Sequence, residues 1–345
     1  MRVLSTLTPP SWNKYWYGSN LLLSASILRI GIGLSLLFII ISYFNISDYS
    51  QYFQQVDLQS YRPISVLQVF GSDIPSVSFF QISKIIAEVS SVLFCLGFLT
   101  KYSGFTSLFF HLIIFSVQYS WGASPDHGLN AVYLVQFALL FSPSNYFLSI
   151  DAVLFKNKNN KWIYFQNNGW GVYLAQFGLT LIFLSAFFFK NFKNPYLSWA
   201  FSDSLRNYII QEYLITLRIP IPAYLQLIIQ YEVIYKGLAF FSMICQCLSV
   251  FACFAVRKPK VRLFFGLLFL LENIGIGLVV QLWQIVVFPL IVIFIDWENL
   301  FPKITPKFKF LESNLISPKR IHFRTSLLFA TLSFIFLFHL ILLVI

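Results

Sequence analysis

The sequence contains few charged residues. Only 11% of its 345 residues are Asp, Glu, Lys or Arg, whereas 58% are hydrophobic. Soluble domains carry roughly 25% charged and 45–50% apolar residues, so these proportions exclude a soluble globule. The 41 Phe residues also exclude a disordered chain, because disordered segments are poor in aromatic residues and rich in charge.

Cysteine is scarce, and the motifs of several enzyme classes are missing. Four Cys in a chain of this length exclude a small disulfide scaffold. The sequence has no P-loop, CxxC, HExxH or GxGxxG motif, so phosphate-loop, zinc and dinucleotide sites have no support. We therefore expect no metal site and no nucleic-acid partner. In a chain this apolar, the net charge of +11 points to anionic lipid headgroups of a bilayer as the partner.

Long apolar runs predict the fold class. A helix that crosses a bilayer needs about 20 mostly apolar residues. The runs that meet this need, or nearly do, are 21–43, 80–99, 105–120, 128–147, 170–189, 225–256, 263–295 and 325–345. The sequence thus predicts an all-α, polytopic helical membrane protein with about nine transmembrane helices, if 263–295 crosses twice.

The run 263–295 decides the topology. As a single helix it would be about 50 Å long, against a hydrocarbon core of about 30 Å. A break near Gly275–Gly277 or at Gln281 would turn it into a hairpin of two short helices. With a cytoplasmic N-terminus, the hairpin places most basic residues on the inner side and the C-terminus outside, as the positive-inside rule requires.

The remaining segments predict interfacial structure. Residues 1–20 are polar and aromatic without a signal-peptide cleavage site, so we interpret them as an N-terminal interfacial segment. The segments 44–79 and 190–224 are expected to form interfacial or re-entrant helices on the outer face, because they mix apolar and aromatic residues. Residues 301–345 predict a basic inner loop followed by the final transmembrane helix.

Ionisable residues inside the spans are candidates for function, because they are costly in a bilayer. Two pairs lie four residues apart and are expected to neutralise themselves on one helix face: Lys84 with Glu88, and Glu232 with Lys236. Glu272 has no such neighbour and is expected to pair with Lys236 or Arg29, or to stay protonated. The predicted intramembrane polar pocket consists of Glu232, Glu272 and Arg29.

A second candidate site lies at the outer mouth. His127 begins the fourth span and Lys190 ends the fifth, so the nine-span topology brings both to one leaflet. Titratable groups placed where water is scarce are what a proton-abstracting site uses. The alternative is that Lys190 only extends its ammonium to the interface from a helix end.

Several segments resemble the horizontally transferred transmembrane domain (HTTM) family, which includes the vitamin K-dependent γ-carboxylases. The segment 26–34 resembles the Arg-containing first span of that family. The segment from His127 to Asp151 looks like the family's helix that starts at a His, and the segment from Gln176 to Lys190 is similar to the next helix. The likeness runs in order over roughly 20–300, which we interpret as an HTTM-like transmembrane domain, 21–300.

The resemblance implies a chemistry. Lys190 would be the base that deprotonates a reduced quinone such as vitamin K hydroquinone, and His127 would support carbanion chemistry in a carboxylase-like lyase. The substrate would be an exported peptide or a quinone-type lipid at the outer leaflet. A chain with only the membrane part also resembles the sporulation-delaying-protein B group, whose members take part in producing exported antimicrobial peptides.

Three functions therefore compete: a carboxylase-like enzyme, an accessory maturation factor for a secreted peptide without carboxylase activity, and a small-solute transporter. Transport is disfavoured, because it predicts inverted repeats with broken helices in corresponding halves, and the sequence has no internal repeat.

Overall fold

The computed structural model describes residues 21–43, 61–70, 74–120, 127–142, 144–154, 170–193, 197–254, 258–280, 287 and 291–301. The regular structure within these ranges is helical, without a strand. The chain divides into two compact units. Unit 1 comprises Met1–Ala175 and Asp296–Ser313, and unit 2 comprises Gln176–Ile295 and Asn314–Ile345.

Five described helices are long and apolar enough to cross a bilayer. They are α2 (Leu22–Tyr43), α4 (Val77–Leu96), α9 (Trp170–Lys193), α13 (Glu232–Phe254) and α14 (Pro259–Val280). The predicted all-α class is therefore confirmed for the described residues, and several of their helices have the length and composition of membrane spans. The count of nine stays a prediction, and the expected last span, 325–345, lies outside the described residues.

In unit 1, α2 packs against α4 and α6 (His127–Leu140), and α4 packs against α5 (Thr100–Tyr119). Close approach depends on small residues: a Cβ at Gly33 would lie 2.5 Å from the Cβ of Cys95. Among the described residues, the unit also contains three shorter elements: η2 (Ser65–Phe70), α7 (Ile150–Leu154) and α16 (Trp297–Leu300).

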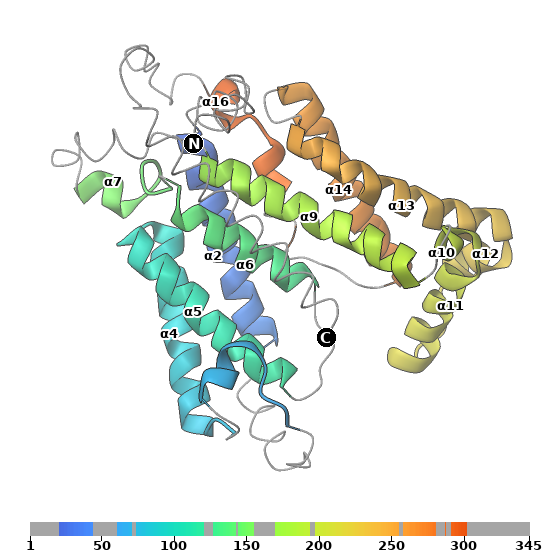
Figure 1. The fold of residues 1–345 in the computed structure, drawn as a ribbon, viewed down its shortest axis with the longest axis horizontal. Coiled ribbons are helices and arrows are strands. Elements are labelled where there is room, and N and C mark those ends of the chain that lie inside the picture. Colours follow the sequence, from blue (N-terminus) through green and yellow to red (C-terminus); the bar gives the residue numbers. More distant parts are fainter. Residues whose placement is uncertain are drawn as a thin grey trace, which may run out of the picture. The chain divides into compact units, whose positions relative to one another are not determined.

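Unit 2 contains α13 and α14 and a group of short helices at the N-terminal end of α13 (Figure 1). We call this group the cap: α10 (Ser198–Phe201), α11 (Ser204–Gln211), η3 (Glu212–Thr216) and α12 (Ala223–Gln230). Buried Ile209, Tyr213 and Leu225 of the cap pack against Ile276 and Val279 of α14. The cap therefore covers the start of α13 and the end of α14, which run antiparallel. The predicted span 225–256 is divided, because α12 ends at Gln230 and α13 begins at Glu232.

The run 263–295 turns back on itself, but not at the predicted glycines. Helix α14 continues through Gly275 and Gly277 to Val280, so a break there is wrong. After the turn, η5 (Val292–Phe294) lies beside the first half of α14. The backbone carbonyl of Phe294 accepts a hydrogen bond from Arg262 Nε at 3.1 Å. The other predicted break, Gln281, lies outside the described residues.

Candidate functional site

Three membrane helices of unit 2 join polar side chains in one cluster, which we call the Lys190 cluster. Lys190 Nζ on α9 donates to Gln246 Oε1 on α13 at 3.1 Å. Gln246 Nε2 donates in turn to Glu272 Oε1 on α14 at 2.7 Å. Ser242, one turn before Gln246 on α13, donates from its hydroxyl to the same Glu272 oxygen at 3.0 Å. The amide of Gln246 therefore bridges the ammonium and the carboxylate.

The carboxylate is deeply buried and only half satisfied. Glu272 is 4% exposed and Gln246 is 3% exposed. Both hydrogen bonds of the Glu272 carboxylate go to Oε1, while Oε2 is buried without a hydrogen-bond partner among the described atoms. An unsatisfied carboxylate oxygen in a low-dielectric interior is costly. The site therefore retains capacity for one more hydrogen or hydrogen-bond donor.

Lys190 forms the more accessible end of the cluster. Its side chain is partly exposed, unlike that of Glu272. The Nζ atom lies 4.3 Å from the centroid of the Trp199 ring, which belongs to α10 of the cap. A cation over the face of an indole ring is attracted by the ring quadrupole. The cap thus contributes directly to the surroundings of the ammonium.

Local sequence explains how the helices present these groups. Ser242 and Gln246 are four residues apart and therefore share one face of α13. On the next turn, Ser249 Oγ donates to the backbone carbonyl of Thr180 at 3.1 Å, which fixes α13 against α9. Stacked rings of Phe183 on α9 and Phe269 on α14, with centroids 4.4 Å apart, join these two helices beside the cluster.

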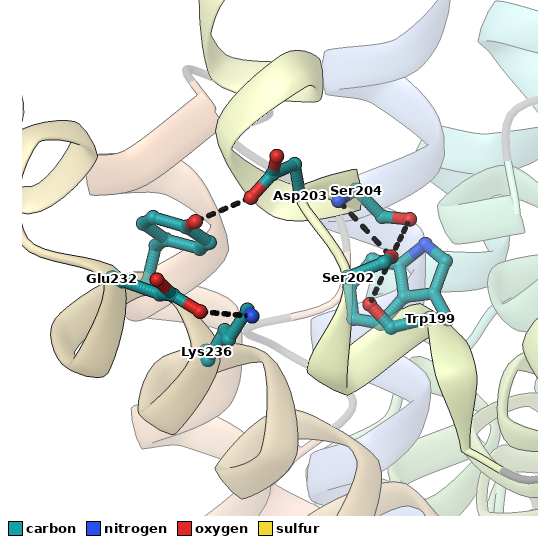
Figure 2. A network of polar contacts seen from close by, with 7 residues as sticks. Trp199, Ser202, Asp203, Ser204, Glu232 and Lys236 are labelled. Carbon is teal, nitrogen blue, oxygen red and sulfur yellow. Dashed lines mark hydrogen bonds and ion pairs between the residues drawn. The ribbon is translucent and has the colours of Figure 1, made fainter.

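The two residues of the predicted polar pocket that lie in unit 2, Glu232 and Glu272, have different partners. Glu272 is linked to Lys190 through Gln246, and it does not pair with Lys236. Glu232 does not belong to the cluster: its side chain is 66% exposed and forms an ion pair with Lys236 (Figure 2). That pairing was predicted, and so was the pair of Lys84 and Glu88, whose charged atoms lie 3.7 Å apart.

A separate polar network lies where the cap meets the start of α13 (Figure 2). Tyr235 donates its hydroxyl hydrogen to Asp203, the residue before α11. The hydroxyls of Ser202 and Ser204 are 2.7 Å apart and close the turn between α10 and α11. These contacts fix the cap to α13, and through it they position Trp199.

Arg29 has a structural role in unit 1. It is fully buried on α2 and donates to the backbone carbonyls of Ser144, at 2.6 Å, and Leu148. It thereby fastens the segment after α6 to α2. Asp151 caps the start of α5 by accepting hydrogen bonds from the backbone N–H groups of Leu99 and Thr100. Arg29 and Glu272 thus belong to different units.

His127 begins α6 in unit 1, and its side chain lies outside the described residues. Its predicted convergence with Lys190 therefore stays a prediction.

Sequence reasoning missed the residues that complete the cluster. It considered only ionisable side chains inside the spans, so it passed over Gln246, Ser242 and Trp199. A signal was present, because a Gln in the middle of an apolar helix needs polar partners in a bilayer. Which neighbours supply these partners depends on helix packing, which a single sequence does not give.

The described residues contain no group of three His, Cys, Asp or Glu side chains arranged to hold a metal ion. No family model matches the chain, and no curated protein or solved structure matches it significantly.

Proposed function

We propose that this chain is a multi-pass membrane enzyme of the HTTM and γ-carboxylase-like type that abstracts a proton from a quinone-type lipid at the outer leaflet. Lys190 is the proposed base. The observation that supports this role is the position of Lys190: its amine is held by Gln246 on a helix with the length and composition of a membrane span, yet the residue is partly exposed. An amine placed there can meet a lipid-soluble substrate where water is scarce.

The proposed step is a simple proton transfer. The O–H bond of the reduced quinone breaks, and an N–H bond forms at the neutral Lys190 amine. The products are a lysine ammonium and a quinol monoanion. The ammonium is stabilised by the same two contacts that hold Lys190 in the structure, the Gln246 oxygen and the Trp199 ring.

His127 is the proposed supporting residue for a later carbanion step, and an exported peptide is the proposed acceptor of the chemistry. Both assignments come from the resemblance. The interfacial position of the cap belongs to the same proposal: exposed Leu214, Ile215 and Tyr224 suit the headgroup layer beside the Lys190 cluster.

The test is an anaerobic titration of the purified chain in lipid nanodiscs with a reduced naphthoquinone, near neutral pH, where the free quinol is not ionised. The wild type should produce the absorbance band of the quinol monoanion. Lys190→Met and Lys190→Arg should lose this band, because methionine has no amine and arginine stays protonated. Lys236→Met, a lysine outside the cluster, should keep it.

Binding is measured separately, by quenching of tryptophan fluorescence by the quinone. Lys190→Met should still bind quinol, which separates loss of chemistry from loss of binding. A wild-type protein without the monoanion band, or a Lys190→Met variant that retains it, would exclude Lys190 as the base. That result would favour the accessory maturation role, in which no proton transfer at Lys190 is needed.

A further inference from the structure

Glu272, at the buried end of the Lys190 cluster, is a potential negative charge in a low-dielectric interior. A lysine ammonium and a glutamate carboxylate inside a bilayer are each costly alone and are tolerated when they neutralise each other. Here the two groups do not touch, because the Gln246 amide lies between them. The titratable side chains in electrostatic contact with Glu272, within the described part of the chain, are Lys190 on α9 and Cys245 on α13.

The orientation of the bridging amide fixes the roles of its two neighbours. Lysine only donates hydrogen bonds and an ionised glutamate only accepts them. The Gln246 oxygen faces Lys190 and its nitrogen faces Glu272, which is the one orientation that satisfies both. Ser242 donates to the same carboxylate oxygen, so Glu272 Oε1 accepts twice. These contacts suit an ammonium and a carboxylate linked through a neutral amide, a state with zero net charge.

The free oxygen of Glu272 can take up a proton when Lys190 loses its charge. Oε2 is buried, has no hydrogen-bond partner among the described atoms, and belongs to a residue that is only 4% exposed. An unbalanced carboxylate at this position would be an isolated charge in a low-dielectric interior. Protonation at Oε2 removes that charge without disturbing the two hydrogen bonds at Oε1.

We propose that Glu272 is the counter-charge of Lys190 and takes up one proton on Oε2 whenever Lys190 becomes a neutral amine. Before it takes up a substrate proton, the cluster then holds a single proton that is either on Lys190 or on Glu272, and its net charge is zero. The positive charge that Lys190 gains from the quinol is balanced by the quinol monoanion. Glu272 is a positioning residue in this scheme, because it acts through Gln246 and touches no substrate. The inference rests on the proposed function only in taking Lys190 as the base that must become neutral.

The experiment observes the carboxyl group directly and uses no quinone. Carbon-13 NMR of glutamate-labelled protein in nanodiscs reports whether each side-chain carboxyl is ionised, and Glu272→Gln assigns the Glu272 signal. At neutral pH the signal should lie at the carboxylate position in the wild type and move to the carboxylic-acid position in Lys190→Met. Lys190→Arg keeps the positive charge and should leave the signal at the carboxylate position. Lys236→Met is the matched control and should also leave it unchanged.

A second variant tests the same charge count in a protein that keeps Lys190. In Gln246→Glu, two carboxylates share one ammonium, so one carboxylic-acid signal absent from the wild type should appear. The inference is overturned if Glu272 is already protonated in the wild type, if it stays ionised in Lys190→Met, or if Gln246→Glu shows only carboxylates. These outcomes are independent of the quinol assay, so failure of the proposed function leaves this test intact.

Discussion

Gln246 is the residue on which the geometry of the Lys190 cluster depends. It makes polar contacts with Ser242 on its own helix, with Lys190 on α9 and with Glu272 on α14. A leucine of similar size would leave the ammonium without its oxygen and the carboxylate without its strongest donor. The uncharged amide of Gln246 therefore helps to stabilise two charged groups, the Lys190 ammonium and the Glu272 carboxylate, in the low-dielectric interior.

Replacing Gln246 by Leu should therefore lower the free energy of unfolding by about 1–3 kcal/mol, the usual cost of leaving a buried polar group without its partner. The measurement is thermal or denaturant unfolding in detergent micelles, followed by tryptophan fluorescence. Gln226→Leu is the matched control, because Gln226 is an exposed amide on α12 whose bond to a backbone carbonyl is also exposed. Equal effects of the two substitutions would contradict a special role for Gln246.

Gly97 shows a second residue-scale requirement. It ends α4 with a left-handed backbone, φ 70°, and a Cβ there would lie 2.5 Å from Arg29 Nη1. Gly97→Ala should destabilise the protein by at least about 1–2 kcal/mol from the backbone conformation alone. Further loss is expected because the added methyl displaces the guanidinium that holds Ser144 and Leu148.

The control for Gly97 is Gly237→Ala on α13, where an added Cβ meets nothing within 4 Å. Alanine favours a helix over glycine by roughly 0.5–1 kcal/mol, so this variant should be as stable as the wild type or slightly more so. Unfolding curves of the two alanine variants measured side by side provide the comparison. Similar losses of unfolding free energy in both variants would contradict the close contact between Gly97 and Arg29.

At the scale of elements, the presence of the helices was predictable and their ends were less so. The predicted span 21–43 coincides with α2 to within a residue, because an apolar run bounded by polar residues leaves little choice. The prediction failed at Gly275 and Gly277, which α14 includes without a break. A helical glycine costs about 1 kcal/mol, whereas an unsatisfied peptide group in a bilayer costs several.

The continuity of α14 can be tested with two glycines of the same helix. An added Cβ at Gly275 meets nothing within 4 Å, so Gly275→Ala should preserve or slightly raise stability if α14 is continuous. If the helix instead broke at Gly275, alanine would restrict the backbone there and no gain in stability would be expected. At Gly266 the Cβ would lie 2.6 Å from the Cβ of Phe294, so Gly266→Ala should destabilise the contact between α14 and η5. The measurement is the midpoint of unfolding. Gly275→Ala should leave the midpoint unchanged or raise it slightly, and Gly266→Ala should lower it.

At the scale of the whole molecule, one contact within unit 1 bears on topology. Glu298 on α16 accepts hydrogen bonds from the backbone N–H of Ser24 at 2.9 Å and from its hydroxyl at 2.6 Å. Ser24 lies in the first turn of α2, so residue 298 lies at the same end of α2 as the N-terminus of that helix. This contact favours an even number of membrane crossings between residues 24 and 298.

An even number agrees with the hairpin in 263–295 and not with a single helix there. Basic-residue counting on the sequence alone reached the same arrangement, because charge asymmetry across a membrane is a property of the whole chain. The site could not be predicted to the same degree. Lys190 and Glu272 were candidates by their charge, but their connection depends on which faces of α9, α13 and α14 meet, and no periodicity of a single helix encodes that.

Reporter fusions test the topology as a whole. A fusion after Phe301 should report the inner side, because the contact between Glu298 and Ser24 keeps this point level with the start of α2, and the N-terminus is expected inside. A fusion after Ile345 should report the outer side if 325–345 makes the ninth crossing. The measurement uses a pair of reporters active on opposite sides, such as alkaline phosphatase outside and green fluorescent protein inside. A control fusion after Phe70 should report outside, since one crossing by α2 precedes it. Outer signals after both Phe70 and Phe301 would reject the hairpin, and they would also mean that Ser24 and Glu298 cannot be in contact in the membrane.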